Sequence, residues 1–401
     1  MNIMQTTFVI VFATLSVVMS AEKTPEEDSN KKTIVLYNGL IIDGTGTPPI
    51  ENGVVVIQGE RITAVGSREE IKIPQKAVKK NLEGKTILPG FINTHVHYAY
   101  DERNLKKWLR AGITTVRDLC PGESRMPGST GGNLTYIRKR DTLNQRTDLT
   151  RILSATSIMG VPGGYGYGSR FSSVKEAQEL VNSYIDDNVD VIKFAITDFE
   201  QGRPWELPTF EQIQAITETA RSRGIKTSAH INLAEHLQWA IDAGVDDIAH
   251  MVVDPVDDTT IQQIIDAGIY WIPTLELWDI VSSQFSLDYR DVAMENLKKF
   301  YQVGGKIALG TDFEGFMGDF DRGFPRTEIQ LMKKAGMSNM AIIVAGTKNA
   351  SFVCGIEEEL GTLEAGKIAD IMVVSGNPLQ DITHLEKIFL VLHEGIVAYE
   401  K

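Results

Sequence analysis

The chain has 401 residues, of which 42% are hydrophobic and 23% are charged. This is an ordinary globular composition, which excludes disordered, collagen-like and coiled-coil proteins. The 53 acidic and 40 basic residues give a formal net charge of −13. Because such a chain repels phosphate and has no basic stripe, we expect no nucleic-acid binding. Two cysteines, Cys120 and Cys354, are too few for a disulfide scaffold or a multi-cysteine zinc module.

The first twenty residues have the features of a signal peptide. Residues 1–20 contain no charged side chain, and residues 8–19 are mostly apolar. This apolar core is too short to span a bilayer as a folded anchor. We therefore expect cleavage near Ala21, export to the periplasm or the outside, a linker over residues 21–32, and no stable membrane span afterwards. An uncleaved membrane anchor and a disordered leader are the alternatives.

Strand-like runs at both ends of the remaining chain predict a small β domain. Residues 33–86 alternate short β-branched runs with Gly, Pro and Asn-Gly turn signals. Residues 360–401 contain similar runs. Because neither segment has enough strands to bury a face alone, we expect them to pair in one composite β-sandwich domain. Two independent β segments are the alternative.

Between these segments, residues 87–359 alternate apolar strand-like runs with helical stretches, which is typical of βα units around a parallel sheet. The eight expected strands are FINTHVH, ITTVRDL, RILSATS, DVIKFAI, KTSAHI, DDIAHM, YWIPTLEL and KIALGTDF. Eight such units predict an α/β protein with a (β/α)8 TIM barrel. An open, doubly wound sheet is the alternative, although no Gly-x-Gly-x-x-Gly motif opens it.

Five of these strands end in polar residues of the types that bind metals. The residues are His95, His97, Lys193, His230, His250 and Asp312. Catalytic groups in such barrels lie at the carboxyl ends of the strands, and two histidines two positions apart on a strand face the same side. Each residue alone has a structural alternative, but five strand ends on one barrel mouth favour a metal site. Three other histidines do not fit this pattern and are assigned no chemistry: His236, His384 and His393.

Longer stretches carry a resemblance to a known family. They are GLIIDGTGTPPIENGVVVIQGERITAVG, GKTILPGFINTHVH, LRAGITTVRD, VDVIKFAI, AGVDDIAHM, LGTDF and GTLEAGKIADIMVVSGNPLQDI. Together they resemble the amidohydrolase superfamily, in the branch of imidazolonepropionases and prolidase-like metallo-dipeptidases. The resemblance implies two divalent metal ions, usually Zn2+. It assigns His95, His97 and Asp312 to one ion, His230 and His250 to the second, and Lys193, as N6-carboxylysine, to both.

This assignment is chemically consistent. A buried lysine loses its proton readily, and its neutral amine can add carbon dioxide to give a carbamate with oxygen ligands. Two metals that share a hydroxide make it a nucleophile at neutral pH. The resemblance then gives Asp312 the catalytic role of taking the hydroxide's proton and passing it to the leaving amine. A single metal with a structural Lys193 is the alternative.

The expected substrate pocket involves Tyr98, which follows the histidine pair, and two residues of the Gly-rich stretch GVPGGYGYGSR, Tyr165 and Arg170. Tyrosine and arginine can hold a substrate carboxylate, although packing is the alternative for the tyrosines. We expect hydrolysis of a C–N bond in a dipeptide or an N-acyl amino acid. The alternatives are a hydrolase of cyclic amides, lactones or phosphotriesters, and a catalytically dead binding scaffold, which the six filled ligand positions disfavour. The sequence leaves a homo-oligomer open.

Overall fold

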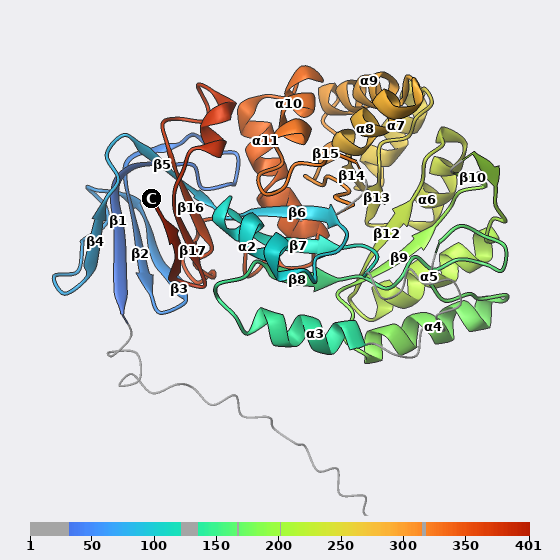
Figure 1. The fold of residues 1–401 in the computed structure, drawn as a ribbon, viewed down its shortest axis with the longest axis horizontal. Helices are drawn as coiled ribbons and strands as arrows, with labels where there is room; N and C mark the ends of the chain where they lie inside the picture. Colours follow the sequence, from blue (N-terminus) through green and yellow to red (C-terminus); the bar gives the residue numbers. More distant parts are fainter. Residues whose placement is uncertain (1–31, 122–134, 167, 201, 315–317) are drawn as a thin grey trace, which may run out of the picture.

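The computed structural model describes residues 32–121, 135–166, 168–200, 202–314 and 318–401. The protein belongs to the α/β class: strands and helices alternate through the central part, and a mixed sheet lies at one end (Figure 1). The expected signal peptide and nearly all of the expected linker fall outside the described residues. Within the described ranges, no helix is long and apolar enough to cross a membrane.

The mixed sheet combines strands from both ends of the chain. They are β1 (Thr33–Ile41), β2 (Ile50–Gln58), β3 (Arg61–Ser67), β4 (Val78–Asn81), β5 (Lys85–Pro89), β16 (Ile371–Ser375), β17 (Ile388–His393) and β18 (Ile396–Glu400). The strand order is β18-β17-β16-β5-β1-β2-β3, and β4 pairs with β1. The antiparallel pair of β5 and β16 joins the two ends of the chain, with Ile87 opposite Val373.

One apolar face of this sheet is shared by both segments. Leu36 and Ile87 from the N-terminal segment belong to the same buried cluster as Ile371 and Leu390 from the C-terminal segment. Burial of each such side chain contributes about 1.5–3 kcal/mol, so each segment depends on the other to exclude water. The strands that we expected in a sandwich are hydrogen-bonded into one eight-stranded sheet.

Eight strands of the central part form two parallel sheets. The first contains β6 (Phe91–Val96), β7 (Ile113–Asp118) and β8 (Arg151–Ser154); the second contains β9 (Val191–Ala195), β12 (Lys226–His230), β13 (Asp247–Ala249), β14 (Tyr270–Ile272) and β15 (Lys306–Ile307). Parallel bridges join Ala155 to Val191 and Val96 to Phe313. Both edges of the first sheet are thereby connected to the second, which is the connectivity that a closed barrel requires.

Helices separate most of these strands. They are α2 (Glu102–Arg110), α3 (Thr135–Asn144), α4 (Val174–Asp186), α5 (Phe210–Ser222), α6 (Leu237–Ala243), α7 (Asp258–Asp266), α8 (Leu275–Phe285), α9 (Tyr289–Gln302), α10 (Arg326–Lys334), α11 (Asn339–Ala345) and α12 (Lys348–Val353). Local sequence sets their ends. For example, Thr209 and Gln212 form a capping box at the start of α5, and Gly244 ends α6 with a left-handed backbone at φ 68°.

All eight central strands are shorter than the expected runs, and two differ most. The run YWIPTLEL leaves the sheet at Ile272, because Pro273 lacks a backbone N–H, and α8 begins at Leu275. In KIALGTDF only Lys306–Ile307 is paired as a strand. Thr274 and Asp312, which follow these two strands, have left-handed backbones at φ 47° and φ 57°. Such conformations turn the chain at the ends of the strands, next to the site described below.

Two buried carboxyl groups connect α8, α10 and the segment before α10. Glu276 is 1% exposed and Glu328 is 0% exposed. Glu328 accepts a hydrogen bond from the N–H of Glu276 at 2.7 Å, and Glu276 accepts one from the N–H of Asp321. Burial raises the pKa of Glu276 to about 9 and the pKa of Glu328 to about 8. Both groups therefore bind their protons more tightly in the folded protein than in the unfolded chain.

We expect the free energy of unfolding to fall as the pH rises from about 5 through about 9. In this range the unfolded chain has lost the two protons that the folded protein still binds, so a rise in pH favours unfolding. Glu276→Gln should reduce this fall by at least about 1 kcal/mol, because one pKa unit corresponds to about 1.4 kcal/mol. Urea unfolding at pH 6 and pH 9 measures the effect, with the exposed Glu69→Gln as the control. An equal loss of stability in the wild type and Glu276→Gln would contradict the prediction.

Candidate metal centre

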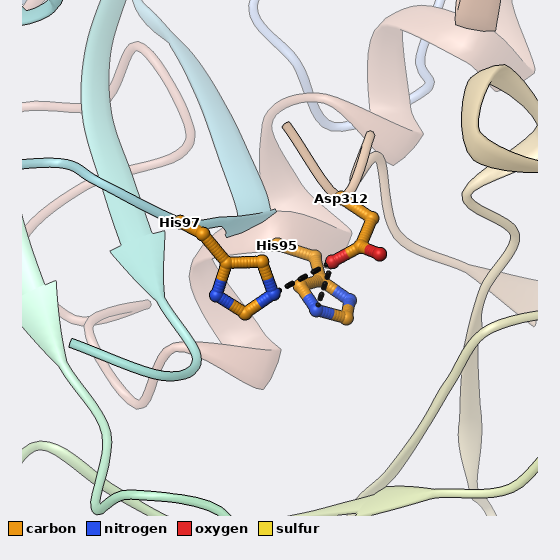
Figure 2. Close-up of side chains that lie close together, drawn as sticks. All are labelled: His95, His97 and Asp312. Atoms are coloured by element: carbon orange, nitrogen blue, oxygen red, sulfur yellow. Dashed lines mark ion pairs between the residues drawn. The ribbon is translucent and has the colours of Figure 1, made fainter. Parts of the chain in front are cut away.

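Three of the expected ligands meet at one point. His95 lies on β6, His97 follows that strand, and Asp312 follows β15. Nε2 of His95 and Nε2 of His97 each lie 2.8 Å from Oδ1 of Asp312 (Figure 2). All three residues are buried, and one potential ligand atom from each lies within 4.8 Å of the others. Two imidazoles and a carboxylate are a donor set that zinc accepts.

Backbone and side-chain hydrogen bonds hold these residues in place. The N–H of Asp312 donates to the carbonyl of His95 at 2.9 Å, and the N–H of His97 donates to the carbonyl of Phe313 at 2.8 Å. The amide of Asn93 donates to the Thr311 hydroxyl at 2.9 Å and accepts from the Thr311 N–H at 3.2 Å. The segment that carries Asp312 is thus fixed against β6 on both sides of the cluster.

The remaining expected ligands surround this group. The His250 ring lies 4.7 Å from the His95 ring and 4.7 Å from the His230 ring, measured between centroids. Lys193, in the middle of β9, is 0% exposed and interacts electrostatically with His95 and Asp312. Its Nζ has no hydrogen-bond partner among the described residues. A buried amine with no partner is unfavourable unless another group supplies one, so the position fits a lysine that is modified or metal-bound.

Burial sets the protonation of most of these groups. It lowers the pKa of Lys193 to about 7 and the pKa of His95 to about 3, and it holds the pKa of His250 well below its usual value. These residues are therefore readily available as neutral nitrogen bases, the form that binds a cation. Burial opposes ionisation of Asp312, but His95 and His97 outweigh it and hold the pKa of this carboxyl well below its usual range. Asp312 is thus a carboxylate.

The sequence analysis missed three residues that contact the expected ligands. Nδ1 of His250 lies 3.0 Å from the Thr274 hydroxyl, Nε2 of His230 lies 3.2 Å from a Glu200 oxygen, and Nδ1 of His97 lies 3.8 Å from an Asp118 oxygen. Such second contacts orient a ligand ring and leave its other nitrogen for a metal. Asp118 and Thr274 also lie at or just after strand ends, so the rule that found the ligands could have found them.

The three expected substrate residues, Tyr98, Tyr165 and Arg170, have different surroundings from one another. The Tyr165 ring stacks on the His230 ring at 4.6 Å and also contacts Trp205. Arg170 donates to the carbonyl of Tyr165 at 3.1 Å and to the carbonyl of Gly166, so its guanidinium holds the loop that carries Tyr165. Tyr98 directly follows His97, is half-buried and has a left-handed backbone at φ 56°. Their roles toward a substrate stay predictions.

The other three histidines lie away from these ligands. His236 contacts Asp198 at 3.0 Å. Together with Glu235, these two residues form a second group of metal-ligand-type atoms. The Asp198 side chain in this group is 42% exposed, unlike the buried ligands of the first group. His384 contacts the carbonyl of Asn377 at 3.1 Å, within the C-terminal segment. His393 contacts the carbonyl of Thr147 at 3.3 Å, at the boundary with the mixed sheet.

Parallel strands that bring together histidines, a buried lysine and an aspartate are typical of a metal-dependent hydrolase. The sequence profile described as the amidohydrolase family matches residues 86–399, and the chain belongs to this family. The ochratoxinase of Aspergillus niger is 25% identical, over 94% of this chain and 89% of the relative. The imidazolonepropionase of Alkaliphilus oremlandii is 23% identical, over 88% of this chain and 91% of the relative.

Solved structures agree with this assignment. A Xaa-Pro dipeptidase with methionine bound in its active site has a TM-score of 0.77 at 25% identity, and the match covers 92% of this chain and 100% of that one. The crystal structure of the A. niger ochratoxinase has a TM-score of 0.79 at 20% identity, with 92% and 96% covered. The second comparison shows that the fold is shared.

Proposed function

We propose that the protein is an exported binuclear metal-dependent amidohydrolase, built on a closed (β/α)8 barrel, that cleaves a C–N bond in a dipeptide or an N-acyl amino acid. The observation that carries the proposal is the approach of His95 and His97 to Asp312, with both nitrogens 2.8 Å from one carboxylate oxygen. The family membership and the likeness to a Xaa-Pro dipeptidase support an amide substrate.

In this proposal the expected ligands divide between two ions. Histidine nitrogens and carboxylate oxygens are ligands of zinc, so we propose Zn2+ for both. His95, His97 and Asp312 would hold one ion, and His230 and His250 would hold the second. Lys193, as N6-carboxylysine, would contact both, and its buried Nζ without a hydrogen-bond partner among the described residues supports this role. When bound, the ions lower the pKa of a water molecule and polarise the scissile carbonyl.

The chain's own residues handle protons and orientation. Asp312 is ionised, so a carboxylate oxygen can take the proton of the attacking water and return it to the nitrogen of the leaving amine. Tyr165, which is 8% exposed and stacked on His230, limits the access of water beside His230 and His250. Tyr98 and Arg170 border the same site in the proposal, Arg170 through its hold on the Tyr165 loop.

Metal removal tests this function on the chain that begins at Ala21, the expected mature N-terminus. We expect two metal ions per chain and turnover of amides in a library of dipeptides and N-acyl amino acids. A chelator should abolish this turnover, and Zn2+ should restore it, because the nucleophile depends on the ions. Protein that keeps full activity without metal would contradict the proposal. Activity confined to lactones or phosphotriesters would favour the alternative substrates, and protein that binds no metal would favour a dead scaffold.

A further inference from the structure

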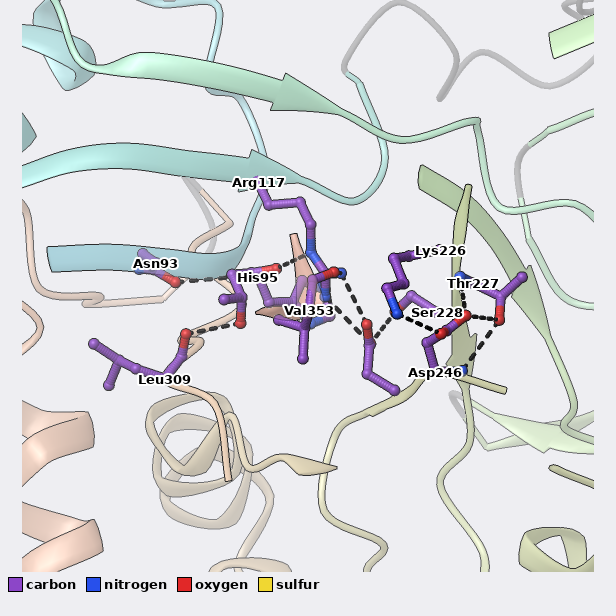
Figure 3. A network of polar contacts seen from close by, with 11 residues as sticks. Asn93, His95, Arg117, Lys226, Thr227, Ser228, Asp246, Leu309 and Val353 are labelled. Atoms are coloured by element: carbon purple, nitrogen blue, oxygen red, sulfur yellow. Dashed lines mark hydrogen bonds and ion pairs between the residues drawn. The ribbon is translucent and has the colours of Figure 1, made fainter. Parts of the chain in front are cut away.

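A fully buried ion pair lies among the parallel strands, beside the candidate metal centre. Arg117 of β7 and Asp247 of β13 are both 0% exposed. Nη1 of Arg117 lies 2.8 Å from Oδ2 of Asp247, and Nη2 lies 3.2 Å from Oδ1 (Figure 3). The two residues are far apart in the sequence and meet only because the strands that carry them come together in the fold.

The same pair connects several other elements. Arg117 donates from Nε to the carbonyl of Thr94 on β6 at 2.7 Å, and from Nη1 to the carbonyl of Val353 at the end of α12 at 2.9 Å. The Ser228 hydroxyl on β12 donates to Oδ1 of Asp247 at 2.6 Å. One guanidinium and one carboxylate therefore hold β6, β7, β12, β13 and α12 together.

The anchor points of this network lie next to expected ligands along the chain. Thr94 directly precedes His95 on β6, and Asp247 lies three residues before His250. Ser228 lies two residues before the ligand at the end of β12, and in the sheet register it is opposite both Asp247 and Lys193. The network thus lies in the same layer as the lysine and directly before the histidines.

Stability alone is a weak reason for a charged pair in this layer. Burial of an ion pair costs several kcal/mol per ion, and an apolar pair of the same shape is often as stable. A guanidinium with several fixed acceptors instead supplies directional bonds. A metal centre needs its ligands placed to within about 0.5 Å. A shift of one strand by a single residue would move a ligand by about 3.3 Å, far more than this tolerance. Directional bonds between the ligand-bearing strands meet that requirement.

We propose that Arg117 is a positioning residue of the metal centre: held by Asp247, it sets the relative placement of β6, β12 and β13. This inference rests on the proposed function, because it presupposes that the ligands on these strands bind metal. It assigns no contact between Arg117 and a substrate.

The test compares Arg117→Met with Arg151→Met in the full chain. Arg151 is a matched control, because its side chain is 14% exposed, pairs with Asp370 at 2.6 Å and begins β8, at the opposite end of the strands from the ligands. The free energy of unfolding of each metal-free protein is measured in urea, and its affinity for Zn2+ is measured by competition with a chelating dye. We expect both variants to lose stability, but only Arg117→Met to bind Zn2+ at least about tenfold more weakly.

Arg117→Lys provides a second variant if Arg117→Met does not fold. Lysine keeps the positive charge but lacks the planar guanidinium, whose N–H groups donate to Asp247, Thr94 and Val353. This variant should therefore also bind Zn2+ more weakly than the wild type. Wild-type affinity in the folded Arg117 variant, or an equal loss in Arg151→Met, would overturn the inference and leave the proposed function standing. A wild-type protein that binds no Zn2+ would instead refute the proposed function, and this inference with it.

Discussion

Lys193→Ala should lose metal and nearly all activity, with kcat/KM at least about a thousandfold lower, which corresponds to about 4 kcal/mol. The reason is that Lys193 is fully buried beside His95 and Asp312, and its Nζ has no hydrogen-bond partner in the part of the chain that the structure describes. Burial lowers the pKa of its amine to about 7, so the neutral form that can add carbon dioxide is accessible near neutral pH. Metal content and kcat/KM are the measurements.

Lys193→Arg separates a carbamate from a structural cation at this position. A guanidinium stays protonated and cannot be carboxylated, so this variant should fail as badly as Lys193→Ala. A short carboxylic acid added to Lys193→Ala should restore part of the metal content and activity, because it supplies the missing oxygens. An arginine variant that holds two metal ions and hydrolyses amides would rule out the carbamate, and would leave a centre built on histidines and Asp312.

Asp312→Asn should keep the fold and lower kcat by at least about a hundredfold, because the amide cannot accept the proton of the attacking water. The loss should appear mainly in kcat, since a proton transfer made only in the transition state does not contribute to ground-state binding. kcat, KM and metal content are measured together, because Asp312 is also an expected ligand.

Asp190→Asn is the matched control for Asp312→Asn. Asp190 is a carboxylate paired with Arg140 at 2.5 Å, and its change should affect stability rather than kcat. An Asp312→Asn protein that is loaded with metal and has a kcat within twofold of the wild type would refute the proton-transfer role.

Most of the ligand-type residues could be predicted because one rule applies to them; Lys193, in the middle of β9, is the exception and stood out as a charged residue within an apolar run. Apolar runs mark the strands, and a polar residue at the carboxyl end of such a run stands out against them, as His230 and His250 do. The structure brings these residues together with His95 and Asp312, as the distances and ring contacts show. Their roles toward metal stay proposals.

Other features carry no local signal. Glu200 lies on the two-residue strand β10 (Phe199–Glu200), which has no periodicity, yet the fold places its carboxylate next to His230. Arg117 and Asp247 look like ordinary charged residues within apolar runs, and only the parallel pairing shows that they meet. The sequence could place Arg170 in the Gly-rich loop, but it could not show that the carbonyls of that loop would bind the guanidinium.

The pairing of β5 with β16 has a consequence for how the protein folds. During synthesis the N-terminal strands emerge long before their C-terminal partners. The edge of β5 that pairs with β16 therefore has no partner until nearly the whole chain has left the ribosome. Contacts between such distant segments form slowly, because a long loop must be closed first. A chain with an unpaired edge is open to aggregation in the meantime. Chaperones that hold the nascent chain unfolded would therefore protect this protein throughout its synthesis. For an exported chain, as proposed above, they would also keep it in the unfolded state that a translocation channel requires.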